Sequence, residues 1–431
     1  METQHIVVVG GGAGGLELVT KLGRKYKHDA HVSVTLIDRN LTHVWKPLLH
    51  EVAAGALDAD IDGVDYRVQA AHAHFNFLPG VLCGIDHEKR VINLAAINDD
   101  QGRQIVAARN IPFTYLVLAI GSVTNDFGTK GAQQHCFFLD SVKQATRFHH
   151  QLMNTFLSLQ AEKYPRPLNV AIVGGGATGV ELSAELYKSA ELIRSYGFSD
   201  FQLSQLKITL VEAGPRILPA LPERIAAAAQ QELINLGVKV RVQTPVVEAT
   251  EQGLVTQSGE LIEATIKVWA AGVKAPEFLA QLGCFETNRA NQIVVRPTLQ
   301  STTHSQIFVI GDCAAVEQAD GSRVPPRAQA AHQMAECAYL NIVAMLKQQP
   351  LRHFVYRDHG SLVSLSSYSA VGSLMGNLTR GAMMVEGWLA RVMYKSLYRM
   401  HQVAVHGYFK TILFILVQKL NRRLKPRLKL H

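Results

Sequence analysis

The feature that most constrains the fold is a structural unit that the sequence contains twice. Each copy has a short β-branched run, a glycine-rich loop, a helical stretch and a second apolar run that ends in an acid. The first copy spans residues 6–38 and the second spans residues 170–212, and their glycine loops begin 164 residues apart. A repeated strand–helix–strand unit predicts an α/β protein with two doubly wound, Rossmann-like domains.

The first glycine loop has the spacing of a dinucleotide-binding site. The first glycine of the pattern GxGxxG allows a tight turn, the second lets the backbone approach a pyrophosphate, and the third lets the helix pack close to the strand. The acid that ends the unit follows the last glycine by 23 residues and can accept hydrogen bonds from a ribose. The residues assigned to this cofactor site are Gly10, Gly12, Gly14, Gly15 and Asp38.

The second loop repeats the pattern with Gly174, Gly176 and Gly179. Its acid, Glu212, lies 33 residues after the last glycine, and this longer spacing fits an insertion around residues 195–205. A carboxylate here would repel a 2′-phosphate and bind a free 2′-hydroxyl, so it favours NADH over NADPH. The nearby Arg216 leaves the choice open. Two dinucleotide folds in one chain indicate that one holds FAD and the other delivers NAD(P)H to it.

Residues 302–312 resemble the second FAD fingerprint of the flavoproteins with two dinucleotide folds. The segment has a threonine, an apolar strand and then Gly311 and Asp312. A similar buried strand at residues 115–121 also ends in a glycine, Gly121. The resemblance implies that Asp312 hydrogen-bonds the ribityl chain of a non-covalent FAD, which leaves the second fold to NADH as substrate.

Three shorter stretches narrow the family further. Residues 43–51, with Lys46 and Pro47, stand where disulfide reductases carry redox cysteines, and this segment has none. Glu181 follows the last glycine of the second loop by two residues. Ala271 and Gly272 form a small-residue end to an apolar strand.

A fourth stretch, Ala-Gln-Ala-Ala-His-Gln at residues 328–333, predicts a helix that approaches a flat ring. Gln329 and Gln333 are four residues apart and share one helix face, while the alanines between them allow close contact. Two neutral amides can donate hydrogen bonds to quinone oxygens without imposing a charge. The alternative is an ordinary alanine-rich helix with surface glutamines.

Together these stretches resemble the type II NADH dehydrogenases, the non-proton-pumping NADH:quinone oxidoreductases, over essentially the whole chain. Residues 372–380 and the basic end resemble the proteobacterial branch. The resemblance implies a hydride transfer from NADH to FAD and electron transfer to ubiquinone or menaquinone. It places Glu181 near the nicotinamide and the two glutamines at the quinone. Some relatives carry a lysine where this chain has residues 366–369, including Tyr368, so the proton route to quinone stays open.

The expected organisation is a split FAD domain, an NADH domain between its parts, and a C-terminal quinone- and membrane-binding module. The FAD domain comprises residues 1–140 and 280–345, the NADH domain residues 141–279 and the module residues 346–431. Residues 380–431 hold eleven Lys or Arg and one acid; since the whole chain carries +8, residues 1–379 carry a net −2. A basic end of this kind indicates a partner with an acidic surface.

The last segment, residues 381–431, has the composition of in-plane amphipathic helices. The apolar residues at helical spacing are Leu389, Val392, Met393, Leu397, Met400, Leu413, Leu416, Val417, Leu420 and Leu424. The sequence therefore predicts a peripheral protein bound to anionic lipid on the cytoplasmic face of the cell inner membrane. The alternative is that these helices pack on the protein's own core or form a homodimer contact.

Composition and spacing argue against several other classes of protein. The five cysteines include no CxxC pair, which argues against a disulfide scaffold and a zinc ribbon, and no histidine pair has the geometry of a helical metal site. No run reaches the 18 apolar residues of a membrane span, and no secretory signal is evident, so an intracellular protein with reduced thiols is expected. The rival functions are a ferredoxin- or rubredoxin-type NADH reductase, a sulfide:quinone reductase, which would need cysteine pairs, and a flavoprotein of the apoptosis-inducing-factor kind whose basic surface binds nucleic acid. We expect no nucleic-acid partner.

Overall fold

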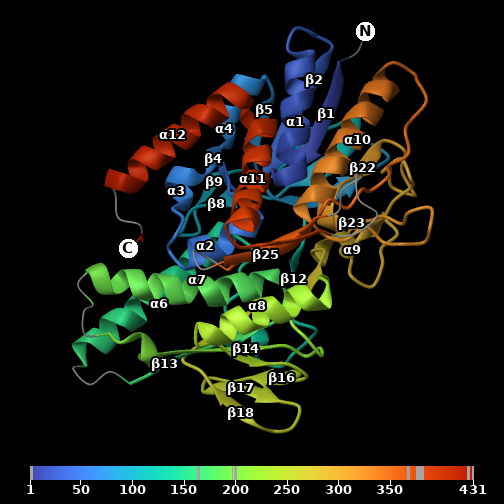
Figure 1. The fold of residues 1–431 in the computed structure, drawn as a ribbon. Helices are drawn as coiled ribbons and strands as arrows, with labels where there is room; N and C mark the ends of the chain where they lie inside the picture. Colours follow the sequence, from blue (N-terminus) through green and yellow to red (C-terminus); the bar gives the residue numbers. More distant parts are fainter. Residues whose placement is uncertain are drawn as a thin grey trace. The chain divides into compact units, whose positions relative to one another are not determined.

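The computed structural model describes residues 3–162, 166–196, 198, 201–365, 369–374, 383–424 and 428–429. By its contacts the chain forms two compact units (Figure 1). The first unit comprises Met1–Trp45, Gly63–Val123 and Val273–Arg357, and the second comprises Lys46–Asp62, Thr124–Gly272 and Asp358–His431. Each unit contains a parallel sheet with helices, so the predicted α/β class is confirmed. The domain boundaries expected from the sequence remain a prediction.

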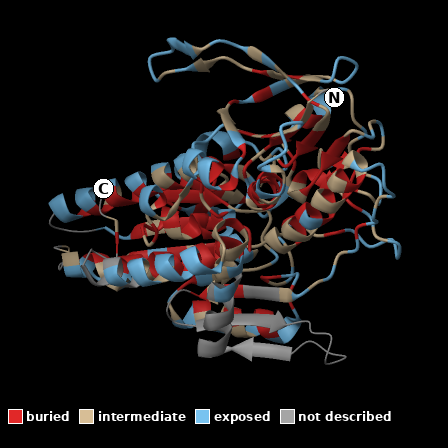
Figure 2. Cartoon of the chain, turned by 90° about the horizontal axis from the view of Figure 1, so that it is seen from above, coloured by how far each residue is buried: buried red, intermediate tan, exposed pale blue. Residues whose placement is uncertain are grey.

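The first unit is built on a five-stranded parallel sheet. Its order is β22 (Ile307–Val309), β11 (Tyr115–Leu118), β1 (Gln4–Val9), β2 (Val32–Asp38) and β5 (Asn76–Pro79). The central strand reads Ile-Val-Val-Val and is almost completely buried, as expected for a parallel strand covered on both faces (Figure 2). Helices α1 (Ala13–Tyr26) and α10 (Ala328–Leu346) pack against each other beside this sheet.

The first unit also contains a small antiparallel sheet and a short helix, α4. Strands β6 (Leu82–Asp86), β7 (Val91–Leu94) and β10 (Arg109–Pro112) form an antiparallel sheet. Helix α4 (Tyr66–Ala73) begins after Asp65, whose carboxylate accepts a hydrogen bond from the Val68 amide and so satisfies one free N–H of the first turn. This cap fixes where Tyr66 enters the core.

The second unit repeats the parallel architecture with four strands. Their order is β15 (Lys239–Arg241), β14 (Leu206–Val211), β13 (Leu168–Val173) and β19 (Ile266–Trp269). The same unit holds α6 (Val142–Ala161), α7 (Ala177–Ile193), α8 (Glu223–Asn235) and the antiparallel strands β16 (Val246–Ala249), β17 (Gly253–Thr256) and β18 (Leu261–Glu263). The short helix α2 (Leu49–Ala53) lies against α6 and α7.

The C-terminal part of the second unit contains a hairpin sheet and two helices. The strands are β24 (Gly360–Leu365), β25 (Ser369–Leu374) and β26 (Met383–Glu386), followed by α11 (Gly387–His406) and α12 (Tyr408–Leu424). Gly407 has a φ of +82° between the helices, a conformation that glycine adopts without strain. The predicted C-terminal helices are therefore present. Within the described ranges, none of the helices combines the length and the apolar character needed to span a bilayer.

A contact between two phenylalanine rings gives a test of how α6 is held. Phe148 is fully buried, and its ring meets that of Phe137 edge-on with centroids 5.5 Å apart. We expect Phe148→Ala to lower the free energy of unfolding of the second unit by about 3–5 kcal/mol, because it removes packed apolar surface and leaves a cavity. Leu157→Ala on the same helix is the control, since Leu157 is 54% exposed and should change little. Equal losses in denaturant titrations of the two variants would contradict this account of the core.

Candidate active site

Of the four glycines predicted for the first loop, one has open space at its Cβ position and three are tightly packed. Gly10 has a φ of +104°, and a Cβ there would lie 2.3 Å from the Ala119 carbonyl oxygen. A Cβ on Gly15 would lie 1.9 Å from the Gly10 carbonyl oxygen, and one on Gly14 would lie 2.8 Å from the Ala331 carbonyl oxygen. A Cβ on Gly12, by contrast, meets no heavy atom of the described residues within 4 Å. This open cradle at the start of α1 fits a pyrophosphate.

Asp38 is fixed beside that cradle by backbone amides. Its Oδ2 accepts a hydrogen bond of 2.6 Å from the Gly11 amide, and its Oδ1 accepts one of 2.7 Å from the Asn40 amide. The Tyr66 hydroxyl donates to the Gly11 carbonyl at 2.7 Å. Burial raises the pKa of Tyr66 well above its usual value, so this hydroxyl stays a donor. Tyr66 has no motif around it, and the sequence reasoning missed it.

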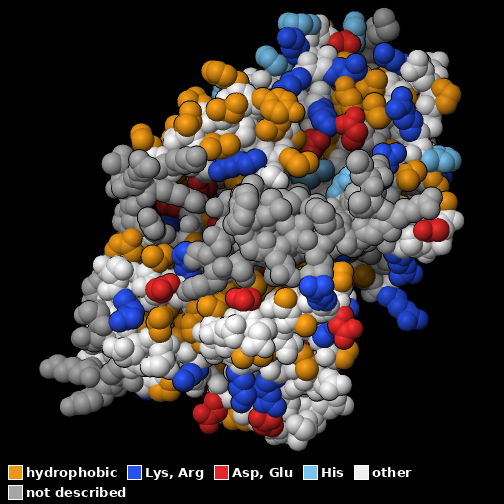
Figure 3. Space-filling model, in the orientation of Figure 1, with side chains coloured by type: hydrophobic (Ala, Val, Ile, Leu, Met, Phe, Trp, Pro, Cys, Tyr) orange, Lys and Arg blue, Asp and Glu red, His pale blue; other side chains and the backbone are white. Residues whose placement is uncertain are grey.

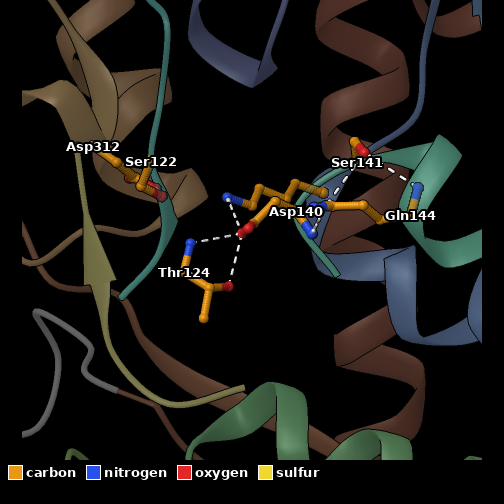
Figure 4. Close-up of polar contacts among 7 residues, drawn as sticks. Ser122, Thr124, Asp140, Ser141, Gln144 and Asp312 are labelled. Atoms are coloured by element: carbon orange, nitrogen blue, oxygen red, sulfur yellow. Dashed lines mark hydrogen bonds and ion pairs between the residues drawn. The ribbon is translucent and has the colours of Figure 1, made fainter. Parts of the chain in front are cut away.

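A second carboxylate of the first unit, Asp312, lies just beyond the carboxyl end of β22. The Ser122 hydroxyl donates to Asp312 Oδ2 at 2.7 Å (Figure 4), and the Gln292 amide donates to the Asp312 carbonyl at 2.9 Å. Gly121 and Gly311 have φ angles of +77° and +75°, so both strand ends turn sharply at the predicted glycines. Ser122 follows one of those glycines and is a site candidate that the sequence reasoning missed.

The second glycine loop has the same geometry as the first. Gly174 has a φ of +110°, and a Cβ there would lie 2.7 Å from the Cα of Ala271. A Cβ on Gly179 would lie 2.0 Å from the Gly174 carbonyl oxygen, whereas one on Gly176 meets no described heavy atom within 4 Å. Gly272 has a φ of +69°, and a Cβ there would lie 2.4 Å from the ring of Phe127. The predicted small-residue strand end thus borders the loop.

Glu212 holds the second loop as Asp38 holds the first. Its Oε2 accepts a hydrogen bond of 2.7 Å from the Gly175 amide, and its Oε1 accepts one of 2.6 Å from the Gly214 amide. Arg216 donates to the Leu221 and Pro219 carbonyls at 2.8 and 3.1 Å. The guanidinium thus has backbone partners of its own, which favours a ribose hydroxyl rather than a 2′-phosphate beside Glu212.

Two predicted site residues of the second unit, Glu181 and Lys46, each lie near a titratable side chain. Glu181, on α7, is buried; its Oε1 accepts a 3.0 Å hydrogen bond from the Ser364 amide, and its Oε2 lies 3.5 Å from His50 Nδ1. Lys46 Nζ lies 3.8 Å from Asp140, which also accepts hydrogen bonds of 2.8 Å from the amide and the hydroxyl of Thr124 (Figure 4). His50 and Asp140 were not recognised from the sequence as site candidates.

The predicted glutamines both lie on α10, four residues apart as expected. The Gln333 side-chain amide donates to the Arg357 carbonyl at 2.8 Å and accepts from the Arg357 backbone amide at 2.9 Å. These two hydrogen bonds hold the backbone of Arg357 against α10. A quinone-binding role for the two glutamines remains a prediction. Tyr368 lies outside the described residues.

The described residues show no cluster of metal ligands, and two of the cysteines are buried thiols. In the part of the chain that is described, no three His, Cys, Asp or Glu residues are grouped to hold a metal ion. Burial raises the pKa of Cys313 and of Cys337 to about 11, so both thiols stay protonated at neutral pH.

Comparisons with known proteins agree with this geometry. Residues 4–335 match the pyridine nucleotide-disulphide oxidoreductase family. The type II NADH:quinone oxidoreductase of Haemophilus influenzae is 49% identical over 99% of this chain and 100% of that protein. The enzyme of the same name from Staphylococcus saprophyticus is 32% identical over 88% of this chain and 92% of its own. The solved structure of NDH2 from Plasmodium falciparum in complex with NADH shares the fold, with a TM-score of 0.81, 18% identity and 99% coverage of both chains.

The family predicted from the sequence is therefore confirmed. The chain belongs to the pyridine nucleotide-disulphide oxidoreductase family and, within it, to the type II NADH:quinone oxidoreductases.

Proposed function

We infer that this protein is an FAD-dependent enzyme that oxidises NADH and reduces a membrane quinone, ubiquinone or menaquinone, without pumping protons. The observation that carries this inference is the pair of matched glycine loops. Each loop has one open glycine at a helix start and one carboxylate bonded to a loop amide, in a chain 49% identical to a named enzyme of this activity.

The residues of the first unit fit a non-covalent FAD. The amides at the start of α1, next to Gly12, would bind the pyrophosphate, and Asp38 would accept hydrogen bonds from a ribose. Asp312, oriented by Ser122, would bind the ribityl chain. When bound, FAD accepts a hydride from NADH and passes two electrons to the quinone.

The residues of the second unit fit NADH. The start of α7 beside Gly176 would take the pyrophosphate, while Glu212 would take the free 2′-hydroxyl. Glu181 is buried on the same helix and would lie near the nicotinamide.

Anaerobic spectroscopy of the purified protein tests the activity directly. Its visible flavin absorbance should bleach on addition of NADH and recover on addition of a quinone. Recovery with ferredoxin but not with quinone would favour a ferredoxin-type reductase instead. Strong binding to DNA that falls steeply with salt would favour the rival with a nucleic-acid-binding surface.

The exposed face of α12 supports membrane binding. Its exposed apolar or aromatic residues are Tyr408, Phe409, Ile412, Leu413, Phe414, Leu416, Val417 and Leu420 (Figure 3). A contiguous group of exposed apolar side chains on one helix indicates an interaction site. Because residues 380–431 carry a net +10, we propose that this surface lies in the headgroup layer of an anionic membrane, on the cytoplasmic face of the inner membrane. A homodimer contact is the alternative.

Substitutions at the two open glycines, Gly12 and Gly176, should affect FAD binding and NADH binding separately. Gly12→Ala should weaken FAD binding roughly tenfold while the apoprotein stays folded, because the new methyl group fills only the cradle. Gly176→Ala should keep FAD and raise the KM for NADH by a similar factor. Flavin content and steady-state kinetics measure both effects. Loss of flavin from the Gly176 variant would contradict the assignment of the two loops.

Glu212 should set the nucleotide preference. We expect kcat/KM to favour NADH over NADPH by roughly tenfold or more, since the carboxylate repels a 2′-phosphate. Glu212→Gln should narrow this preference with the flavin still bound. Equal use of the two nucleotides by the unaltered enzyme would rule out this role.

The glutamines of α10 should act in the second half of the reaction. Gln329→Leu and Gln333→Leu should slow flavin reoxidation by quinone about tenfold, while stopped-flow bleaching by NADH stays near normal. Gln333→Leu also removes the two hydrogen bonds to the Arg357 backbone, so Gln329→Leu tests the role at the quinone more directly. If bleaching slows as much as reoxidation in Gln329→Leu, the residue does not serve the quinone specifically.

Membrane binding can be tested without removing the chain's end. The triple change Leu413→Gln, Leu416→Gln and Leu420→Gln should weaken binding to anionic vesicles at least about tenfold, because each leucine loses apolar burial. FAD content and electron transfer from NADH to ferricyanide should be spared. Deleting residues 381–431 should also release the enzyme, but it removes the contact of Lys429 with Asp58 as well.

The control for this experiment is Ile105→Gln, since Ile105 is equally exposed but lies in the first unit. Unchanged sedimentation of the triple variant with vesicles would refute lipid binding through α12. Conversion of a dimer to a monomer, with vesicle binding intact, would assign the face to a homodimer contact.

A further inference from the structure

A histidine and a glutamate of the second unit face each other in its interior. His50, on α2, is 3% exposed, and Glu181, on α7, is 5% exposed. His50 Nδ1 lies 3.5 Å from Glu181 Oε2, while the amide of Ser364 donates to Oε1 at 3.0 Å. A buried carboxylate is stable only where hydrogen-bond donors meet it, so its orientation depends on such groups.

The imidazole is suited to orienting this carboxylate without adding charge. Burial lowers the pKa of His50 to about 4, and a hydrogen bond to the Pro47 backbone opposes the shift only in part. The ring is therefore neutral at physiological pH, and the tautomer with its proton on Nδ1 is a donor.

The segment that carries His50 is held by parts of the second unit far from it in sequence. The hydroxyl of Ser189, on α7, donates to the Ala54 carbonyl at 2.7 Å. The Lys429 amide donates to the Gly55 carbonyl at 2.9 Å, and Lys429 Nζ lies 3.0 Å from the carboxylate of Asp58. The segment directly after α2 is thus tied to α7 and to Lys429 by these contacts.

We propose that His50 is a positioning residue, which orients the Glu181 carboxylate for the nicotinamide end of NADH. This rests on the proposed function, because it takes Glu181 to lie beside the nicotinamide. His50 is one of several groups around this carboxylate, because the Ser364 amide and further contacts also hold it.

The test compares His50→Leu with His50→Asn, alone and together with Glu181→Gln. Leucine has a similar size and no donor, whereas asparagine places an amide nitrogen near the position of Nδ1. In His50→Leu we expect the affinity of the oxidised holoenzyme for NAD⁺, measured by calorimetry, and the rate of flavin bleaching by NADH each to fall about tenfold. His50→Asn should recover most of both losses. With Glu181→Gln present, His50→Leu should add little further loss, because the partner has already changed.

His150→Leu is the matched control, since His150 is an exposed histidine of the same unit and should behave like the unaltered enzyme. Additive losses in the double variant, or equal losses for asparagine and leucine, would overturn the proposal. If His50→Leu fails to fold, Glu181→Gln should restore folding by replacing the buried carboxyl group with a neutral amide, and a double variant that stays unfolded would also overturn it. Unaltered enzyme that NADH fails to bleach would instead contradict the proposed function.

Discussion

The structure depends on a hydrogen bond that occurs once in each unit, between a loop amide and the carboxylate that ends the next strand. Gly11 donates to Asp38 at 2.6 Å, and Gly175 donates to Glu212 at 2.7 Å. The bond ties the turn before the helix to the neighbouring strand, so the helix start and the acid keep a fixed geometry. Nucleotide binding then needs little rearrangement, because both the pyrophosphate cradle and the ribose acceptor are formed in advance.

The sequence predicted those parts of the fold that are determined by residues close together in the chain. Only glycine fits at Gly10 and Gly174, because φ is positive there and a Cβ atom would clash with neighbouring backbone atoms. The loops could therefore be recognised from residue type and spacing. The acids at the ends of β2 and β14 follow from the same rule. The helix that carries both glutamines was predicted for a similar reason, since periodicity and alanine content are local properties.

Residues that matter through long-range contacts could not be found in this way. Tyr66 reaches Gly11 across 55 positions, Ser122 reaches Asp312 across 190, and His50 lies beside Glu181 although 131 positions separate them in the sequence. Tyr66 and Ser122 belong to no spacing pattern, and the stretch that contains His50 was noted for the cysteines that it lacks rather than for this histidine. The contacts of these three residues become visible only when the fold brings distant segments together. The exposure of α12 is of the same kind, because periodicity predicts an apolar stripe but does not say whether the stripe is covered.

The C-terminal segment combines two roles that its composition alone would not separate. Basic residues suggest a single electrostatic surface, yet Lys429 lies within hydrogen-bonding distance of Asp58 and of Asp60, and its neighbour Leu428 is buried. At least one basic residue of this segment therefore stabilises the second unit rather than meeting a lipid. The chain's end reaches the segment that holds His50, whereas α12 presents its apolar side chains to the outside. Changes in α12 and changes at Lys429 consequently act on different physical quantities. The first alter exposed apolar surface, and the second alter ion pairs with Asp58 and Asp60 and a backbone hydrogen bond to Gly55.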